Sequence, residues 1–207
     1  MLVTKIHRDL DSILDELIDN QQVCAIFQNH SEWGPRALGN RSILFDPRHN
    51  DAKNIVNTIK KREYYRPFAG TVMLEHADEY FEMLQLKESP YMSFAIQCKP
   101  KALETIPTLV HGDNTCRIQT VTEQQNPNYY NLIKGFYERT GCPIIFNTSF
   151  NLGGEAICET IYDAVDTCNR SLINHLYVPE DQEIEIPYEC IRDKARLANP
   201  ENPDPCN

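Results

Sequence analysis

Apolar residues recur at two different spacings along this 207-residue chain, and the spacing predicts the helices and the strands. Apolar positions three and four residues apart predict helices over 7–20, 51–62, 127–140 and 160–170. Short apolar runs predict strands at 23–27, 42–45, 70–75, 92–98, 116–122, 142–146 and 172–178. Helices and strands that follow one another at short intervals indicate a single domain of the α/β or mixed α+β class.

Three local signals set the expected limits of these elements. Asn126, followed by proline, is expected to open the helix over 127–140, and Gly141 is expected to end it. Pro67 is expected to stop the helix over 51–62, because proline cannot continue one. The sequence becomes acidic and proline-rich near its C-terminus, so we expect one domain over 1–180 and an irregular tail over 181–207.

Composition narrows the class of protein. No apolar run approaches the ~18 residues of a membrane-spanning helix, and the N-terminus lacks the layout of a signal peptide, so we expect a cytoplasmic protein. The eight cysteines show no CxxC spacing and no histidine at ligand spacing, which predicts buried, reduced thiols. Trp33, the one tryptophan, is expected to pack in the interior. A net charge of −10 argues against non-specific binding to nucleic acid or to an anionic membrane.

One basic segment contrasts with this acidic background. Residues 34–70 carry eight basic and three acidic side chains, which gives the segment a charge of +5. A solvated positive face is the ordinary interpretation of such a segment. Here, however, Arg36 lies among turn-forming residues, and Lys60, Arg62 and Arg66 surround an expected helix end. Because guanidinium forks match phosphate and carboxylate oxygens, the segment predicts a site for a small, highly charged anion.

A second candidate stretch follows the apolar strand at 142–146. Asn147, Ser149 and Asn151 alternate there with other side chains, and two glycines come next. Ligands in α/β sheets bind beyond the carboxyl ends of strands, so these polar side chains are expected to form a ligand cradle. An ordinary polar turn is the alternative.

Arg117 and Gln119 form a third candidate, because alternation places both on one face of a strand. An arginine in a strand that otherwise reads as core needs an anionic partner, which is either a ligand or a structural carboxylate. His111 and Asp113 lie close in sequence and are either an acid–base pair or, as is more common in a loop, structural. None of these patterns by itself names a reaction.

Six blocks of the sequence together resemble a known family. In order along the chain they are GPRALGNRSIL-DPR, N-x-I-K-x-R-E-x-x-R-P-F-A, SPYM, R-I-Q-T-V, NPxYYxLI and NTSFN-x-x-GE. This succession resembles the C-terminal domain of the O-carbamoyltransferases, which include nodulation-factor and antibiotic carbamoylating enzymes. The resemblance runs from about residue 22 to about residue 178. It implies a YrdC-like fold, in which an open twisted sheet is flanked by helices.

The resemblance also implies an activity. In that family the domain binds carbamoyl phosphate and ATP, with Mg²⁺ accompanying the nucleotide, and produces carbamoyladenylate. It implies no metal-binding residues in this domain. Matched position by position, the implied catalytic residues are Lys60, Arg66 and Arg117. The implied carbamoyl phosphate- and ATP-binding residues are Arg36, Arg62, Asn147, Ser149 and Asn151.

A Kae1-like domain performs the transfer to an acceptor hydroxyl in that family. Its metal-binding histidine pair and phosphate loop do not occur in this sequence, so a separately encoded Kae1-like partner is expected. Gly70, Asn114 and Ala156 stand where the family usually has proline, glycine and proline, and none of these departures removes a charge. The alternatives are a non-catalytic ligand-binding or partner-docking module and, less favoured, an RNA-binding YrdC-like domain.

Overall fold

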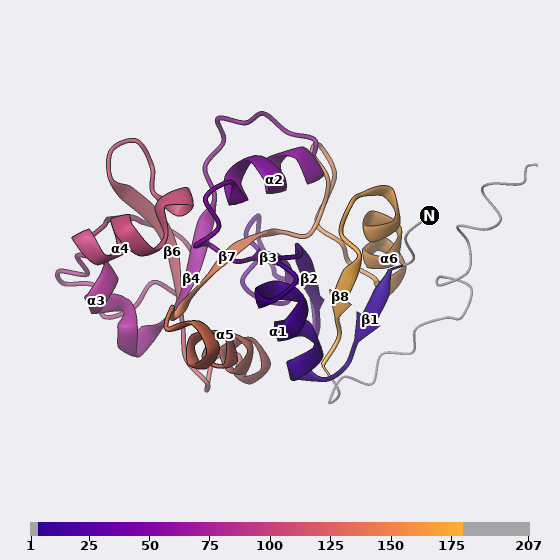
Figure 1. The fold of residues 1–207 in the computed structure, drawn as a ribbon, viewed down its shortest axis with the longest axis horizontal. Helices are drawn as coiled ribbons and strands as arrows, with labels where there is room; N and C mark the ends of the chain where they lie inside the picture. The colour runs from indigo at the N-terminus through magenta and orange to yellow at the C-terminus, as the bar shows by residue number, and fades with distance from the viewer. Residues whose placement is uncertain (1–3, 180–207) are drawn as a thin grey trace, which may run out of the picture.

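The structure is a computed structural model that describes residues 4–179, and these residues form one mixed sheet between helices (Figure 1). The strand order is β1-β8-β2-β3-β7-β4-β6-β5. The strands are β1 (Lys5–His7), β2 (Cys24–Phe27), β3 (Arg41–Phe45), β4 (Ala69–Met73), β5 (Ala95–Gln97), β6 (Thr115–Val121), β7 (Ile144–Ser149) and β8 (His175–Tyr177). The predicted mixed α/β class is therefore confirmed.

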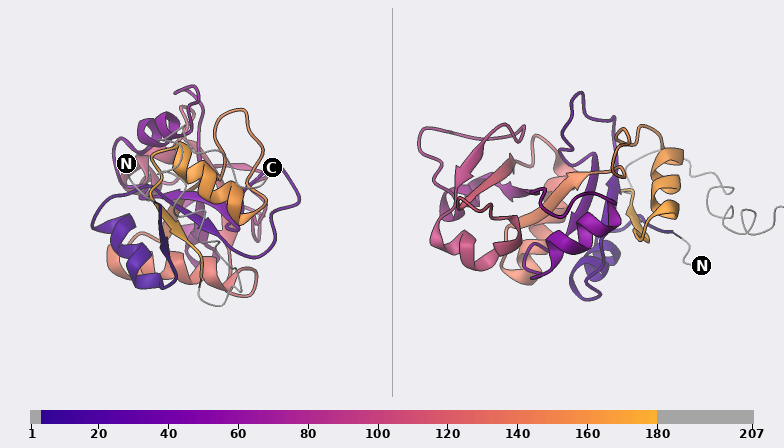
Figure 2. Two further views of the ribbon diagram at one scale, coloured as in Figure 1. Left: turned by 90° about the vertical axis from the view of Figure 1, so that its right-hand side faces the viewer. Right: turned by 90° about the horizontal axis from the view of Figure 1, so that it is seen from above.

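Helices cover both faces of this sheet. The helices are α1 (Leu10–Ile18), α2 (Ala52–Ile59), α3 (Ala77–Tyr80), α4 (Pro100–Thr105), α5 (Pro127–Thr140) and α6 (Ile161–Arg170), with short 3-10 turns η1 (Leu74–His76) and η2 (Pro107–Leu109). In Figure 1, α1 and α5 lie together on one side of the sheet and α2 lies on the other. Figure 2 shows α6 at one end of the sheet and α3 and α4 at the opposite end. Two apolar clusters fill the space between sheet and helices.

Capping residues set the ends of two helices, and those of α5 explain why it was predicted well. The Asp9 carboxylate accepts a hydrogen bond from the Ser12 backbone N–H at 2.8 Å and so begins α1. The Asn126 side chain caps α5 in the same way, and Gly141 ends that helix with a φ of +73°. Both limits of α5 match the prediction because each is set by a local signal.

Two of the predicted boundaries that differ from the structure bear on the site. Helix α2 ends at Ile59, well before Pro67, because Lys61 adopts a φ of +51° and turns the chain. Strand β7 extends through Asn147 to Ser149, so these residues belong to a strand and not to a loop. The polar end of β7 is therefore held in register between β3 and β4.

Strand β1 was not predicted, because its three residues fell into and just before an expected helix. It pairs in parallel with β8 at the edge of the sheet. Trp33 is fully exposed, so the prediction that it packs in the interior was wrong. The cysteines of the described part of the chain are all buried and free, as predicted.

Some of the predictions concern residues that the structure does not describe. Cys190, Cys206 and the predicted tail over 181–207 lie outside the described residues. Among residues 4–179, no helix combines the length and the apolar composition that crossing a bilayer requires.

Candidate functional site

Lys60 is the first residue after α2, and its side chain is almost completely buried, with 2% of its surface exposed. Its Nζ donates to the backbone oxygen of Ser149 at 2.5 Å and to that of Asn151 at 2.9 Å. Nζ also donates to Asn151 Oδ1 at 2.8 Å, and Ser149 Oγ lies 3.3 Å from Nζ. Lys60 therefore fixes the chain that follows β7, and a ligand oxygen would bind it by replacing one of these acceptors.

The environment of Lys60 also sets its charge. Burial, and secondarily the nearby Arg62 guanidinium, lower the pKa of Lys60 to about 7. An anion placed beside this lysine would stabilise the ammonium form and raise its pKa again. Near neutral pH the side chain can thus take up a proton when an anion binds.

A cavity of about 650 Å³ opens above Lys60. Five residues predicted for the site line it together, and the complete lining is Lys60, Lys61, Arg62, Glu63, Arg66, Ser149, Asn151, Leu152, Gly153 and Gly154. Gly153 donates from its backbone N–H to the Lys60 oxygen at 2.7 Å. A Cβ at that glycine would lie 2.9 Å from the backbone oxygens of Lys60 and Lys61, so the close approach of the two loops requires glycine.

The two arginines of the cavity differ in mobility. Arg62 is fixed, since its Nε donates to Asn57 Oδ1 at 2.6 Å and its guanidinium stacks 3.9 Å from the centre of the Phe68 ring. Burial, followed by the charge of Arg66, lowers the pKa of Arg62 to about 10. Arg66 is more than half exposed and pairs with Glu63 at 2.9 Å. Such an exposed ion pair is worth little, so Arg66 can exchange Glu63 for a ligand anion.

Arg36 and Arg117 form a second basic pair. Burial, followed by the charge of Arg36, lowers the pKa of Arg117, which shows that the two guanidiniums repel each other. Within residues 4–179, neither arginine has an acidic partner at ion-pair distance. The structural salt bridge that was the alternative explanation of Arg117 is therefore absent from the described part of the chain. Two neighbouring cations without a protein anion are the arrangement expected of an anion site.

Asn147 lies beside this pair and is 1% exposed. Its Nδ2 is near three acceptors, Ala37 O at 3.2 Å, Thr71 Oγ1 at 3.0 Å and Gln119 Oε1 at 3.3 Å. Its Oδ1 is buried and has no hydrogen-bond partner in the described residues. Because buried acceptors are nearly always paired, this oxygen is suited to receive an N–H from a ligand.

The sheet connects the two groups, although Arg36, Arg117 and Asn147 do not line the Lys60 cavity. Asn147 in β7 and Arg117 in β6 are both paired with Ala69 of β4, which lies between these two strands. Their Cα atoms are therefore roughly 10 Å apart in one row across the sheet. Ser149 lies two residues beyond Asn147 on the same strand and therefore on the same face. The predicted site residues thus follow one end of the sheet.

Two other basic residues of segment 34–70 have structural roles. Arg41 is 3% exposed, stacks 3.6 Å from the centre of the Phe27 ring and donates to the backbone oxygens of Gln28 and Asn29. Arg48 pairs with Asp46 at 2.6 Å. The charge of +5 counted from the sequence therefore overstates the positive charge that a ligand would meet.

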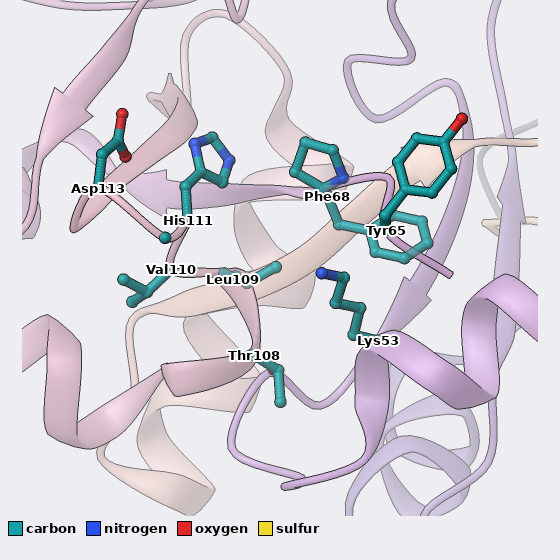
Figure 3. A pocket seen from close by; sticks show the side chains of 10 residues that line it. Lys53, Tyr65, Phe68, Thr108, Leu109, Val110, His111 and Asp113 are labelled. Carbon is teal, nitrogen blue, oxygen red and sulfur yellow. The ribbon is translucent and has the colours of Figure 1, made fainter. Parts of the chain in front are cut away.

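Sequence reasoning missed a second cavity, of about 440 Å³, whose lining includes Tyr65, Pro67 and Phe68, the neighbours in sequence of Arg66, which lines the first cavity (Figure 3). In Figure 3, Lys53 extends into it between His111 and Tyr65. Asp113 Oδ1 accepts from the Thr115 backbone N–H at 3.0 Å, and His111 Nδ1 lies 3.1 Å from Thr115 Oγ1. His111 and Asp113 thus each contact Thr115, which favours the structural interpretation over an acid–base pair.

Comparison with known protein families shows which family this chain belongs to. The family model described as carbamoyltransferase C-terminus matches residues 15–182. The chain belongs to the carbamoyltransferase C-terminus family. The resemblance seen in the six sequence blocks is therefore confirmed.

Curated carbamoyltransferase relatives are several times longer than the matched region. The chain is 41% identical to nodulation protein NolO of Bradyrhizobium diazoefficiens, over 77% of this chain and 29% of the relative. It is 44% identical to nodulation protein NolNO of Sinorhizobium fredii, over 77% of this chain and 24% of the relative. It is 32% identical to 3'-hydroxymethylcephem-O-carbamoyltransferase of Amycolatopsis lactamdurans, over 76% of this chain and 29% of the relative. The chain thus spans less than a third of these proteins.

Solved structures share the fold at low identity. Full-length HypF in the phosphate- and nucleotide-bound form has a TM-score of 0.56 at 19% identity, over 82% of this chain and 21% of that chain. Sua5 of P. abyssi complexed with L-threonine has a TM-score of 0.57 at 12% identity, over 86% of this chain and 49% of that chain. These likenesses confirm the expected YrdC-like fold of this carbamoyltransferase C-terminus.

Proposed function

We propose that the chain binds carbamoyl phosphate and ATP along the basic end of its sheet and forms carbamoyladenylate, with Mg²⁺ accompanying the nucleotide. Membership of the carbamoyltransferase family supports the carbamoyl chemistry. The observation that carries the rest is the pair Arg36 and Arg117, which has no acidic partner in the described residues, together with the separate cavity of Lys60 and Arg66 at the same end of the sheet. Together these four side chains offer more positive charge than one monoanion requires.

Two anionic substrates explain that excess. Carbamoyl phosphate and ATP repel each other, so a site that joins them must supply fixed positive charge where negative charge accumulates. The carbamoyl group also carries an amide N–H₂, and the buried, unpaired Asn147 Oδ1 is an acceptor for it. Arg36 and Arg117 would then hold the phosphate, while Arg66 and Lys60 contact the polyphosphate of ATP.

The reaction needs positioning and charge more than a protein nucleophile. Water accepts the phosphoryl group of carbamoyl phosphate, which leaves as inorganic phosphate. The remaining carbamate oxygen attacks the α-phosphorus of ATP, the bond from that phosphorus to the β-phosphate oxygen breaks, and pyrophosphate leaves. One phosphate and one pyrophosphate are therefore released for each carbamoyladenylate.

The second half of carbamoyl transfer requires another site. We propose that a Kae1-like partner domain moves the carbamoyl group from the adenylate to an acceptor hydroxyl, and that both steps occur in the cytoplasm. The length of the relatives supports this division, since the chain matches only 29% of NolO. The acceptor is expected to be chosen by that partner.

Release of phosphate and pyrophosphate tests this proposal. The chain, with the Kae1-like domain added in one arm, is incubated with carbamoyl phosphate, ATP and Mg²⁺. We expect equal amounts of both products and a strict need for both substrates. Calorimetric binding of carbamoyl phosphate without any pyrophosphate release, with the partner present, would instead identify a non-catalytic binding module.

Removing either Arg66 or Arg117 should slow this reaction. Arg66→Ala and Arg117→Ala are each expected to lower pyrophosphate release by about 100-fold, because each removes a charge that stabilises the transition state. Arg139→Ala is the matched control, since Arg139 is also ion-paired but lies on α5, outside the cavity. Unchanged rates in both site variants would remove these arginines from the mechanism.

The low pKa of Lys60 predicts a pH-dependent affinity. Above pH 7 the ligand-free protein loses the Lys60 proton, whereas the anion complex keeps it, so binding must take up a proton. The Kd for α,β-methylene-ATP, an ATP analogue whose bridge between the α- and β-phosphates cannot be cleaved, should therefore rise by up to about tenfold per pH unit above pH 7. Calorimetry in two buffers of different ionisation enthalpy measures the proton uptake. A Kd that stays constant through this range, or the same slope in Lys60→Met, would contradict the assignment.

A further inference from the structure

A separate cluster of metal-ligating side chains lies near the opposite edge of the sheet. His7 comes from β1, Glu16 from α1 and His175 from β8. His7 Nε2 lies 3.1 Å from His175 Nδ1, and His175 Nδ1 lies 3.4 Å from Glu16 Oε1. One ligand atom of each residue lies within 4.8 Å of both others. The cluster is far from the candidate site, because β8, β2 and β3 separate β1 from β7.

The fold holds the three residues in place. Strands β1 and β8 run parallel, and the two imidazole rings stack with their centroids 5.3 Å apart. Helix α1, which follows β1 directly, brings Glu16 to them. His175 is 6% exposed and the Glu16 side chain 16% exposed, so bulk water solvates neither group fully.

Hydrogen bonds alone cannot satisfy this cluster. His175 Nδ1 carries at most one proton, which lies in the ring plane and points in one direction. If it donates to Glu16, it cannot accept from His7; if it accepts from His7, its lone pair meets the Glu16 carboxylate. Either tautomer therefore leaves one of the two contacts of His175 Nδ1 without an aligned hydrogen bond. A cation between the three atoms would accept a lone pair from each of them.

The separations also fit a metal ion. Bonds of about 2.0–2.2 Å at tetrahedral angles place two ligand atoms roughly 3.3–3.6 Å apart. The two short distances of the cluster, 3.1 and 3.4 Å, are close to this. We propose that His7, Glu16 and His175 bind one divalent transition-metal ion, with Zn²⁺ as the best match and water in the fourth position. Two imidazoles with one carboxylate suit Zn²⁺, whereas Mg²⁺ and Ca²⁺ prefer oxygen ligands.

The protonation state of the cluster supports this assignment. Burial lowers the pKa of His7 and of His175, although Glu16 acts in the opposite direction on both. Both imidazoles are therefore neutral near pH 7 and keep the lone pairs that a metal requires. Lys5 and Asp9 are the other charged groups that act on His7, and Lys5 also acts on His175.

Such an ion would stabilise the fold. Strand β1 has only three residues and pairs with β8 alone, so little else holds this edge. A metal joined to β1, α1 and β8 would tie the first strand to the sheet. Loss of the metal ion should lower the Tm of the protein and leave carbamoyladenylate formation at the distant basic end of the sheet unchanged. The metal site can therefore be tested independently of the proposed function.

Metal titration of the metal-free chain tests it. We expect one Zn²⁺ per chain by calorimetry, a higher Tm, and with Co²⁺ the visible absorption of a tetrahedral site without a thiolate charge-transfer band. His7→Gln and Glu16→Gln should each weaken Zn²⁺ binding by at least about 100-fold, since even outer-shell changes cost 10–100-fold. Both variants change partly exposed side chains, and circular dichroism checks that they fold.

The matched control is His76→Gln. His76 Nδ1 pairs with Glu79 Oε1 at 2.6 Å, which makes a histidine–carboxylate pair that lacks a second imidazole. This variant should bind Zn²⁺ as the wild type does. Equal affinity in His7→Gln and wild type, or no Zn²⁺ binding and no rise in Tm, would show that the cluster is only a hydrogen-bonded histidine pair. A thiolate band would assign the metal to cysteines and overturn the proposal equally.

Discussion

Lys60→Met should reduce carbamoyladenylate formation by at least about 1,000-fold while the protein stays folded. The substitution keeps most of the side-chain volume but removes the one buried ammonium of the cavity floor. It also removes the hydrogen bonds that Lys60 donates to the backbone oxygens of Ser149 and Asn151. The loop after β7 would then lose its fixed position as well as the charge beside it.

Pyrophosphate release measures this effect, and urea unfolding shows whether the variant is folded. Lys134→Ala is the control, because Lys134 is an exposed lysine of α5 that does not line the cavity. If Lys60→Met releases pyrophosphate at the wild-type rate, Lys60 has no part in the reaction. If Lys60→Met is folded and still binds α,β-methylene-ATP, the charge of Lys60 serves the chemical step more than binding.

Gly39→Ala should lower the free energy of unfolding by at least about 3 kcal/mol. Gly39 has a φ of +107°, a backbone conformation that residues other than glycine rarely adopt. A Cβ there would lie 2.2 Å from Cδ1 of Tyr129, whose ring is fully buried and whose hydroxyl donates to Thr71 Oγ1 at 2.9 Å. Neither the ring nor the backbone has room to move away.

Urea denaturation measures this loss, with Gly34→Ala as the matched control in the same loop. No atom lies within 4 Å of a Cβ at Gly34, so this change should stay within about 0.5 kcal/mol of wild type. Gly39→Ala should also weaken anion binding, because the neighbouring Leu38 oxygen accepts from Gln119 Nε2 at 2.9 Å beside the Arg117 strand. Equal stability of the two variants would mean that the loop is not packed as described.

Local signals in the sequence were enough to predict most elements of this fold. Helix α5 was predicted to the residue because Asn126 and Gly141 fix its ends through contacts within one turn. The end of α2 could not be predicted in the same way. Residues 60–63 are all charged, so apolar spacing does not mark the last helical residue, and the contacts of Lys60 with Ser149 and Asn151 accompany the turn there.

The candidate site shows the same division. Residue types and spacing indicated which basic side chains to consider, and five predicted residues meet in one cavity. The sequence could not show that Arg41 is buried and binds backbone oxygens, whereas Arg36 has no acidic partner in the described residues. That distinction depends on carbonyl groups brought together by folding.

The histidine cluster lay beyond sequence reasoning for a related reason. His7 and His175 are 168 residues apart and meet only because β1 pairs with β8. A three-residue edge strand has too few positions to show a period of two, so neither β1 nor its pairing with β8 could be inferred, although a strand at 172–178 was predicted. The pairing of the first and last described strands is therefore the feature of the fold that only the structure could reveal.

Direct detection of the product tests the central claim most sharply. The chain and a Kae1-like domain are incubated with carbamoyl phosphate, Mg²⁺ and ATP labelled at the α-phosphate, quenched in the cold, and examined by mass spectrometry. Labelled carbamoyladenylate should appear with the wild type only when both substrates are present, and should be lost with Lys60→Met and Arg66→Ala. Intact ATP and no carbamoyladenylate in the complete wild-type mixture would contradict the account.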